Sequence, residues 1–468
     1  MKQIKKFTII DAFISLVKFD KVNEEEKKKI INERLKRLLL ETNENKPLFN
    51  EIYKGIDLNS INLDNLSTLP TTNKLYLQEH FNEWINNPEL KCSEINEFLL
   101  SKDNYLKKYL GKYSIYQTSG TTGAPVTVIN SKSESNVLMA TAIYRTYYSL
   151  NEMLKIVKTG IFNNRTIAVC ILPTKTPCIT TFLATEAKNK IINKIGNANI
   201  VIVDMETPIE EIVKILNKLN PVCIGGYVTY FDSLIDEVKK GNLNINPLYI
   251  TTVGEKLSKE KKEKLDKTFN CETITNYACT ECAEIGHMCE EGHYHINDDW
   301  IIVEAVDKNN NIVSEGELSD KILVTNLFNY TQPFIRYEIN DRCKIHYGKC
   351  SCGRRGPWLE VEGRDFKAIE FEANSGKIFK VSPISLELVV HKHDENILKY
   401  QLVIENDSID VRLQVRDEFK RFETFEKIKK DLKDFLFDNN LKEYSINLSN
   451  ELPKVSKSGK FKQIYQIN

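Results

Sequence analysis

The chain of 468 residues lacks a surplus of either charge, because 65 lysine and arginine residues balance 65 aspartate and glutamate residues. Without a net charge it has no global electrostatic attraction to nucleic acid or to an anionic membrane. It also lacks any apolar run near the roughly 20 residues that a bilayer-spanning helix needs. The segment that follows Met1 has no long apolar stretch of the kind found in secretory signals. These absences predict a cytoplasmic protein that binds neither nucleic acid nor membrane.

The chain is too long for one compact core, and its apolar pattern changes along its length. Residues from about 1 to 100 have apolar side chains at helical spacing. From Thr166 to Val253, strand-like runs alternate with amphipathic helices, which predicts an α/β fold. Beyond Trp300, short strands and turns dominate. We expect a large α/β domain of mixed sheets and helices over 1–364, and a small, mobile α+β domain over 365–468.

One turn, just before the strand-like run Val126–Val128, is rich in glycine and hydroxyl side chains. Glycine lets the backbone approach an anion, and exposed N–H groups and hydroxyls bind phosphate oxygens. The turn has the spacing of neither a Walker loop nor a dinucleotide-binding turn. An ordinary polar loop is the alternative interpretation. Its residues are Thr118, Ser119, Gly120, Thr121, Thr122 and Gly123.

Three further segments follow in the sequence. The first is Gly254-Glu255-Lys256-Leu257, after a predicted strand that ends at Val253. The second is Tyr277-Ala278-Cys279-Thr280-Glu281, after the strand-like run Glu272–Thr275. The third, Pro333-Phe334-Ile335-Arg336-Tyr337-Glu338-Ile339-Asn340-Asp341, ends in a carboxylate that can accept two donors at once. Each segment alone is also consistent with a strand and a structural turn.

In this order the four motifs resemble those of the adenylate-forming superfamily. The flanks of the Thr118–Gly123 turn are most similar to the phenylacetate-CoA ligase branch and its capsule-biosynthesis and coenzyme F390 synthetase relatives. The resemblance extends from Leu69 to Lys460. It implies an enzyme that uses ATP and Mg²⁺ to convert a carboxylic acid into an acyl-adenylate, and then passes the acyl group to a thiol, which we expect to be coenzyme A.

The resemblance also implies a role for individual residues. Thr280 would contact the phosphates and Glu281 would hold Mg²⁺, which prefers carboxylate oxygen. Ala278 stands where glycine is usual, and so does Asn340, although asparagine tolerates left-handed backbone geometry. Asp341 would bind both ribose hydroxyls. Contacts with the nucleotide are implied for Thr118–Gly123, Gly254, Glu255, Tyr277, Asp341 and Arg364.

Two motifs of the C-terminal region complete the resemblance. Gly363-Arg364-Asp365 is similar to the hinge about which the small domain rotates between the two half-reactions. The glycine-rich segment that normally follows is absent, and the run Phe366-Lys367-Ala368-Ile369-Glu370-Phe371 stands in its place. Lys460, in the Ser458-Gly459-Lys460 context, resembles the catalytic lysine that neutralises charge between the acyl carboxylate and the α-phosphate. The alternative is an inert lysine in an exposed tail.

Cysteine is plentiful, with eleven residues that a reducing cytoplasm would keep as thiols or metal ligands. Six of them lie between 279 and 352 together with four of the seven histidines, and tetrahedral zinc needs such converging ligands. The best set is Cys289, His295, Cys350 and Cys352, and some phenylacetate-CoA ligase relatives carry zinc at matching positions. Four protein ligands would make the zinc structural and not catalytic. His287, His293 and Cys282 stay competitors, Cys279 is expected to be a core thiol, and Cys343 is undecided.

The acid is expected to be aromatic, by analogy with the branch and because aromatic residues follow Gly225-Gly226, where the acyl pocket should lie. Tyr227 and Ala278 are the candidate acid-binding residues, although aromatic residues at such spacing also occur as plain core. Three alternatives stay open: a carrier-protein phosphopantetheine thiol as acceptor, transfer of AMP itself, and a non-catalytic scaffold held by zinc. A homodimer is one possible oligomeric state.

Overall fold

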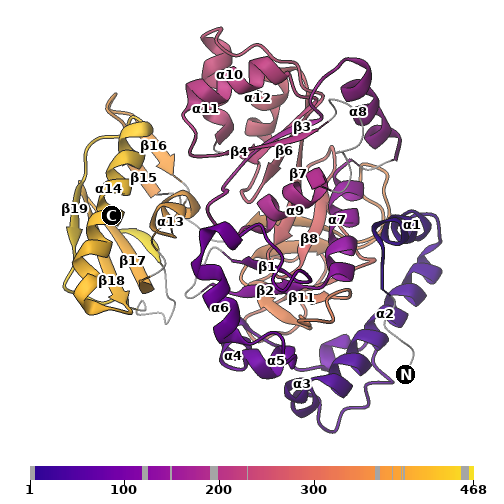
Figure 1. Ribbon diagram of the computed structural model, residues 1–468. Helices are drawn as coiled ribbons and strands as arrows, with labels where there is room; N and C mark the ends of the chain where they lie inside the picture. Colours follow the sequence, from indigo (N-terminus) through magenta and orange to yellow (C-terminus); the bar gives the residue numbers. More distant parts are fainter. Residues whose placement is uncertain are drawn as a thin grey trace. The chain divides into compact units, whose positions relative to one another are not determined.

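The computed structural model describes residues 6–118, 125–147, 150–189, 199–228, 230–363, 369–381, 383–391, 393, 396–454 and 463–467 (Figure 1). The chain divides into two compact units. One comprises Met1–Tyr116 and Val128–Arg364, and the other comprises Gln117–Thr127 and Asp365–Asn468. The division after Arg364 coincides with the expected boundary, but the short segment Gln117–Thr127 falls in the second unit. The domain boundary itself stays a prediction.

The first unit begins with a series of helices whose starts are set by side-chain caps. The Thr8 hydroxyl and Asp11 form a capping box at the first helix, and Asn23 accepts from the Glu26 N–H at the second. Three glutamates in the first turn of the second helix also favour its N-terminus electrostatically. These elements are α1 (Ile9–Phe19), α2 (Glu24–Asn45), α3 (Pro47–Ile52), the 3₁₀ turn η1 (Leu66–Thr68), α4 (Lys74–Glu79), α5 (Phe81–Ile85), α6 (Cys92–Leu100) and η2 (Lys102–Asn104).

A nine-stranded sheet forms the centre of this unit, in the order β13-β14-β9-β8-β7-β6-β5-β3-β4. The strands β4, β3, β5, β6 and β7 are parallel, and the pairs from β7 onward are antiparallel. Ligands of α/β sheets bind outside the carboxyl ends of parallel strands. The strands are β3 (Ala168–Leu172), β4 (Ile200–Asp204), β5 (Cys223–Tyr227), β6 (Tyr249–Val253), β7 (Glu272–Cys279), β8 (Ala283–Met288), β9 (Tyr294–Ile296), β13 (Arg342–His346) and β14 (Trp358–Gly363).

Helices cover this sheet, and smaller sheets flank it. The predicted alternation of strands and helices is present, because helices connect the parallel strands β3 to β7. The helices are α7 (Lys132–Thr146), α8 (Leu150–Phe162), α9 (Ile179–Ala187), α10 (Ile209–Leu219), α11 (Tyr230–Lys239) and α12 (Lys259–Phe269). The smaller sheets are β1-β2 (Ser114–Gln117, Thr127–Asn130) and β10-β11-β12 (Ile301–Val306, Lys321–Asn326, Tyr337–Ile339).

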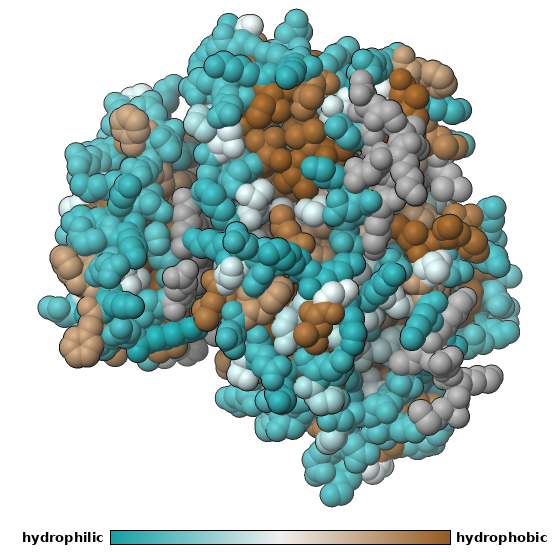
Figure 2. All heavy atoms as spheres, in the orientation of Figure 1, coloured by the Kyte–Doolittle hydropathy of each residue, from teal (hydrophilic) through white to brown (hydrophobic). Residues whose placement is uncertain are grey.

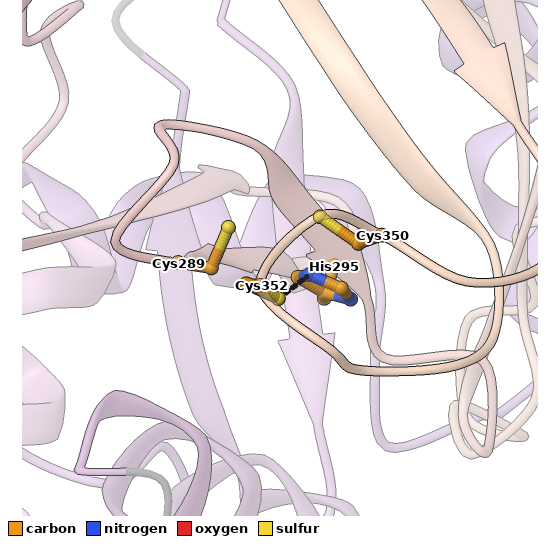
Figure 3. A group of neighbouring side chains, drawn as sticks. All are labelled: Cys289, His295, Cys350 and Cys352. Carbon is orange, nitrogen blue, oxygen red and sulfur yellow. Dashed lines mark hydrogen bonds between the residues drawn. The ribbon is translucent and has the colours of Figure 1, made fainter.

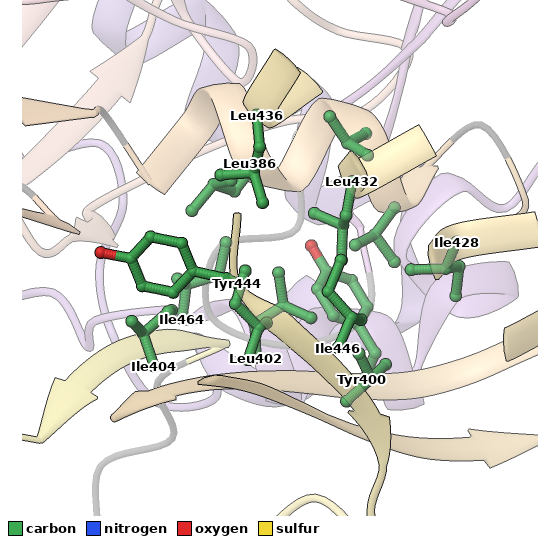
Figure 4. Packing of buried hydrophobic residues seen from close by; sticks show 14 of the residues in the cluster. Leu386, Tyr400, Leu402, Ile404, Ile428, Leu432, Leu436, Tyr444, Ile446 and Ile464 are labelled. Atoms are coloured by element: carbon green, nitrogen blue, oxygen red, sulfur yellow. The ribbon is translucent and has the colours of Figure 1, made fainter. Parts of the chain in front are cut away.

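The second unit has a core of its own. Its four-stranded sheet β19-β18-β17-β20 carries one apolar face, against which α13 and α14 pack (Figure 4). Leu402 and Leu432, both fully buried, meet in this core, and removing such a leucine side chain typically costs about 2–5 kcal/mol. The elements are β15 (Ile369–Glu372), β16 (Ile378–Val381), α13 (Pro383–His391), β17 (Ile397–Glu405), β18 (Ser408–Val415), η4 (Glu418–Lys420), α14 (Arg421–Asp438), β19 (Ser445–Leu448) and β20 (Ile464–Ile467).

The surface is largely hydrophilic, as the balanced charge of the sequence indicates. Hydrophilic residues dominate the face shown in Figure 2, with one larger apolar area near β3, β4 and β6 and smaller ones near α1 and α8. Exposed apolar side chains of these two helices are Ile10, Ile14, Leu154, Ile161 and Phe162. Among the helices that the structure describes, none combines the length and the apolar character needed to cross a bilayer.

A buried carboxyl group lies where β8 packs beneath α7. Glu284 pairs across the β7–β8 hairpin with Ala278, and its Oε2 atom is buried without a hydrogen-bond partner. Burial raises the pKa of Glu284 to about 7, and a hydrogen bond with Asn276 opposes the shift. Below about pH 7 the neutral acid is therefore the prevailing form of Glu284 in the folded chain.

This shifted group predicts a pH-dependent stability. A carboxyl group whose pKa is raised by folding stabilises the fold below its ordinary value, here 4.5, and that contribution disappears as the pH rises through about 7. Glu284→Gln, which is neutral at every pH, should therefore gain about 1–3 kcal/mol of unfolding free energy over wild type between pH 5 and pH 8. Urea unfolding at both pH values measures the gain. The exposed Glu263→Gln serves as control, and an equal pH dependence in all three proteins would contradict the account.

Candidate active site

The turn between β7 and β8 presents Glu281 at its tip. Residues 280–282 form this turn, and Ala283 closes it with a positive φ of 55°. The Tyr337 hydroxyl donates to Glu281 Oε1 at 3.2 Å, and the Asn326 amide donates to the Glu281 carbonyl at 3.4 Å. Tyr337 is only 1% exposed, so burial fixes the position of the ring whose hydroxyl donates to Glu281. The carboxylate is thus oriented through one oxygen, and Thr280 lies beside it in the same partly exposed turn.

Asp341 and Tyr277 meet, although they are 64 residues apart in the sequence. Asp341 lies between β12 and β13, and its Oδ2 accepts a hydrogen bond of 2.7 Å from the Tyr277 hydroxyl. Burial and the neighbouring Asp341 charge together raise the pKa of Tyr277 well above its ordinary value. The tyrosine is therefore a permanent donor, and it connects two of the segments for which the family resemblance predicts nucleotide contacts.

Arg336 has a structural task that the sequence did not indicate. Its side chain is 3% exposed, and its Nε donates to Glu304 Oε2 at 2.9 Å. Its Nη1 donates to the carbonyls of Ser67, at 2.9 Å, and Leu69. The left-handed residue of this motif is also Arg336, with φ 46°, and not Asn340 as its replacement of glycine suggested. The motif is therefore attached to the helical N-terminal region through a buried arginine.

Gly254 and Tyr227 lie at the carboxyl ends of the adjacent parallel strands β6 and β5. A Cβ atom on Gly254 would come within 2.6 Å of Tyr227 Cε1, so only glycine leaves room for this ring. Burial, and then the nearby Cys178 thiol, raises the pKa of Tyr227 well above its ordinary value. Glu255 follows Gly254 at this edge, and Ala278 is exposed at a bulge of β7. These four residues therefore occupy the edge where α/β sheets bind ligands.

Part of the predicted site lies outside the residues that the structure describes. These residues are Ser119, Gly120, Thr121, Thr122, Gly123, Arg364 and Lys460. Thr118 is described: its N–H donates to the Val126 carbonyl at 3.0 Å, and its hydroxyl accepts from the Val126 N–H at 2.8 Å. These bonds bring the two ends of the turn together.

The residues that flank Lys460 in the sequence are fixed to one strand. The Gln401 side chain, on β17, donates to the Lys454 carbonyl at 3.1 Å. The next residue, Leu402, donates its N–H to the Gln463 carbonyl at 2.7 Å. Lys454 and Gln463, the described residues on either side of Lys460, are therefore bonded to neighbouring positions of β17.

A separate cluster joins the thiols and imidazole that the sequence grouped as zinc ligands. Their ligand atoms all lie within 4.8 Å of one another (Figure 3). Cys289 follows β8, His295 lies on β9, and the two remaining cysteines come from the loop between β13 and β14. The Gly353 N–H donates to the Cys350 carbonyl at 2.9 Å, which folds this loop into a tight turn. The cluster is Cys289, His295, Cys350 and Cys352.

The four ligands of this cluster differ in their protonation. Burial raises the pKa of the Cys289 thiol to about 12 and also raises that of Cys352, so these two would have to lose a proton on binding a metal. Burial, and then the Arg354 charge, lowers the pKa of His295 to about 4, so the imidazole is neutral at neutral pH. Burial alone would raise the pKa of the Cys350 thiol, but hydrogen bonds, first from His293, lower it to about 7. Neutral imidazole and thiolate are the forms that bind zinc.

The competing ligands have different surroundings. His293 Nδ1 lies 3.2 Å from Cys350 Sγ, and its ring stacks on Trp358 at 4.2 Å, so it lies beside the cluster. His287 Nδ1 is 3.0 Å from Asn297 Oδ1. Cys282 precedes β8 and Cys289 follows it, so the two lie at opposite ends of this strand. Cys343 is fully buried on β13, and Cys279, expected in the core, is partly exposed at the end of β7.

Comparison with known proteins gives relatives in sequence and in fold. No family model matches the chain. Protein CapK of Staphylococcus aureus is 22% identical over 250 residues, 52% of each chain, so the match spans about half the length of this curated relative. A crystal structure of 2-hydroxyisobutyryl-CoA ligase with 2-HIB-AMP and CoA, in the thioesterification state, has a TM-score of 0.61 at 15% identity. The alignment covers 96% of this chain and 91% of that one.

A second structure of that ligase, in the postadenylation state with 2-HIB-AMP, has a TM-score of 0.58 at 15% identity and covers 96% and 92% of the two chains. These likenesses confirm the predicted fold class, a large mixed α/β domain followed by a small α+β domain. They concern the fold, and the roles of individual residues stay predictions.

The buried ion pair between Arg336 of the Asp341 motif and Glu304 leads to a testable prediction. Arg336→Met should leave Glu304 as an unpaired buried charge, which typically costs about 3–5 kcal/mol of unfolding free energy. The double variant Arg336→Met/Glu304→Gln should recover part of that loss, because it removes the stranded carboxylate. Urea unfolding of wild type, Arg336→Met, Glu304→Gln and the double variant measures both effects. If the loss of unfolding free energy in the double variant equals the sum of the losses in the two single variants, Arg336 and Glu304 do not act as a pair.

Proposed function

We propose that this chain, a member of the adenylate-forming superfamily and a homologue of CapK, is an ATP-dependent ligase that activates a carboxylic acid and transfers it to coenzyme A. The observation that carries the proposal is the meeting of Tyr277 with Asp341 and of Tyr337 with Glu281. Two motifs that are far apart in the sequence thereby each present one carboxylate, and each carboxylate is oriented by its own tyrosine. Asp341 would suit contact with the ribose, and Glu281 would suit contact with a metal ion.

In the first step, the substrate carboxylate attacks the α-phosphorus of ATP, and pyrophosphate leaves with the electrons of the broken P–O bond. In the second step, the thiol attacks the acyl carbonyl, loses its proton and releases AMP. Mg²⁺, when bound, would neutralise phosphate charge, with Glu281 as its carboxylate ligand. Asp341 would accept from the ribose hydroxyls, and Lys460 would balance charge on the carboxylate and α-phosphate. The protein acts mainly by positioning and charge stabilisation.

The acid-binding end of the site is proposed at the carboxyl edge of β5 and β6. Tyr227 supports this placement, because its ring lies against Gly254 and remains partly exposed. An aromatic acid would pack well against such a ring. The second candidate function is a different second step, because the glycine-rich segment that normally follows the hinge motif is missing from this sequence. In that step, the acyl group would pass to a carrier-protein phosphopantetheine thiol, or AMP itself would be transferred.

Pyrophosphate exchange tests the first step. Wild type should exchange labelled pyrophosphate into ATP with at least one member of a broad panel of acids. Lys460→Ala should slow this exchange about a hundredfold or more, because a preorganised cation is lost. Lys457→Ala, in the same segment, is the matched control and should retain exchange.

Failure of every acid to support exchange in wild type would contradict the ligase proposal. Equal activity of Lys460→Ala and wild type would remove only Lys460 from the mechanism. Exchange without thioester formation from coenzyme A would favour one of the two alternatives: a carrier-protein thiol as the acceptor of the acyl group, or transfer of AMP in place of the acyl group.

The Cys/His cluster is proposed as a structural zinc site. Its donor set, three thiolates and one imidazole, suits tetrahedral zinc and leaves no open position for catalysis. Zinc bound there would join the β8–β9 hairpin to the loop between β13 and β14, because its ligands come from both. His295 is the proposed imidazole ligand, and His293 would then be a neighbour of the thiolate of Cys350.

Metal analysis tests this site. Wild type should contain about one zinc per chain, and Cys350→Ser and Cys352→Ser should each lose most of it and unfold at lower temperature. Cys92→Ser, on the distant helix α6, is the control and should keep its zinc. His293→Gln should also keep it, whereas His295→Gln should not. Unchanged zinc in both cysteine variants would rule the site out.

A further inference from the structure

A short segment between β11 and the Asp341 motif is filled with buried amide side chains. Asn326 is 1% exposed, and Asn329 and Gln332 are fully buried. A carboxylate from another part of the chain, Glu134 on α7, is 5% exposed beside them. Buried polar side chains are costly unless they are hydrogen-bonded. These four residues, called here the amide clasp, are all bonded, and their partners belong to three different segments.

The first set of partners is on β2, the strand that follows the Thr118–Gly123 turn. Gln332 Oε1 accepts from the Ile129 N–H at 2.8 Å, and Asn329 Nδ2 donates to the Ile129 carbonyl at 3.2 Å. Two side chains thus satisfy both backbone groups of Ile129, as a neighbouring strand would do. Asn329 Nδ2 also lies 3.4 Å from Asn130 Oδ1.

The second set of partners is in the turn that presents Glu281. Asn326 Nδ2 donates to the Glu281 carbonyl at 3.4 Å. Asn326 Oδ1 accepts from the Phe328 and Asn329 N–H groups, each at 3.1 Å, and its N–H donates to the Phe334 carbonyl at 2.9 Å. The same residue is therefore bonded to the Glu281 turn and to the start of the Asp341 motif.

Glu134 closes the clasp from α7. Its Oε1 accepts from the Tyr330 N–H at 2.9 Å, the Thr331 N–H at 2.8 Å and the Thr331 hydroxyl at 3.0 Å. Its Oε2 accepts from the Ser131 N–H at 2.5 Å, within the cap of α7. Lys46 donates to the Thr331 carbonyl at 3.1 Å, next to this carboxylate. Hydrogen bonds to a charged acceptor are stronger than neutral ones, so the contact is firm.

We propose that the amide clasp is a set of positioning residues that fixes β2, the Glu281 turn and the Asp341 motif relative to one another, and that affinity for ATP depends on it. None of the four side chains needs to touch the nucleotide. They hold the backbone that carries the contacts, and small displacements of such a backbone have large effects on binding. The inference rests on the proposed function, because that proposal assigns ATP to the Glu281 turn and the Asp341 motif.

Variants that break the clasp without removing volume test the inference. Gln332→Met loses the acceptor for the Ile129 N–H, and Glu134→Leu loses all four accepted bonds. Each should raise the dissociation constant of ATP with Mg²⁺, measured by calorimetry, and the KM for ATP by about tenfold or more. The KM for the acid should stay within about twofold of wild type. Glu134→Gln keeps an oxygen toward residues 330 and 331, so it should restore most of the affinity.

A control separates positioning from general loss of stability. Asp20→Asn weakens a different, partly buried contact of α7, the bond of 2.7 Å between Arg145 Nη1 and Asp20 Oδ1. It should lower Tm while ATP binding stays as in wild type. ATP binding by Gln332→Met and Glu134→Leu within about twofold of wild type would overturn the inference and leave the clasp merely structural.

If Glu134→Leu does not fold, Gln332→Met decides the question, because methionine preserves the length of the side chain. A wild-type chain that binds no ATP would instead overturn the proposed function and, with it, the role of the clasp in nucleotide binding.

Discussion

The hydrogen bond between the Tyr277 hydroxyl and the Asp341 carboxylate is the contact on which the site depends. It joins the end of β7 to the segment before β13, across 64 residues of sequence. Because both groups are largely withdrawn from water, the bond is strong and its loss would leave an unsatisfied charge. Tyr337 and Glu281 make a second bond of the same kind nearby, so two tyrosines orient the two carboxylates that the proposed chemistry uses.

These contacts place polar side chains in the interior of the protein, and the fold supplies hydrogen-bond partners for those side chains. Within the Asp341 motif, Arg336 donates to Glu304, and the Phe334 carbonyl accepts from the N–H of Asn326 in the amide clasp. Such groups stabilise little compared with apolar packing of the same volume, but they define one arrangement of the backbone. The surrounding strands supply the hydrophobic core that stabilises the fold. The polar contacts therefore act mainly by fixing the position of the backbone around the site.

Much of this could be predicted from the sequence, because short motifs and periodic patterns are local. The alternation of strands and helices, the turn at Thr280 and Glu281, and the grouping of Cys289 with His295 all depend on neighbouring residues or on ligand chemistry. The structural tasks of Tyr337, Asn326 and Gln332 could not be predicted, because their partners are distant in the sequence and are selected by the fold. Ser131 and Glu134 show the limit: the capping box is visible locally, but the bonds of Glu134 to residues 330 and 331 are not.

The central claim is that the Glu281 turn and the Asp341 motif form one nucleotide site. Hydrogen–deuterium exchange in the presence and absence of ATP with Mg²⁺ tests it most directly, because exchange reports on each backbone segment separately. The account predicts that ATP slows exchange in peptides covering residues 278–283 and in those covering 338–342, with no change in α10. Slower exchange in only one of the two segments, or in neither, would contradict the claim.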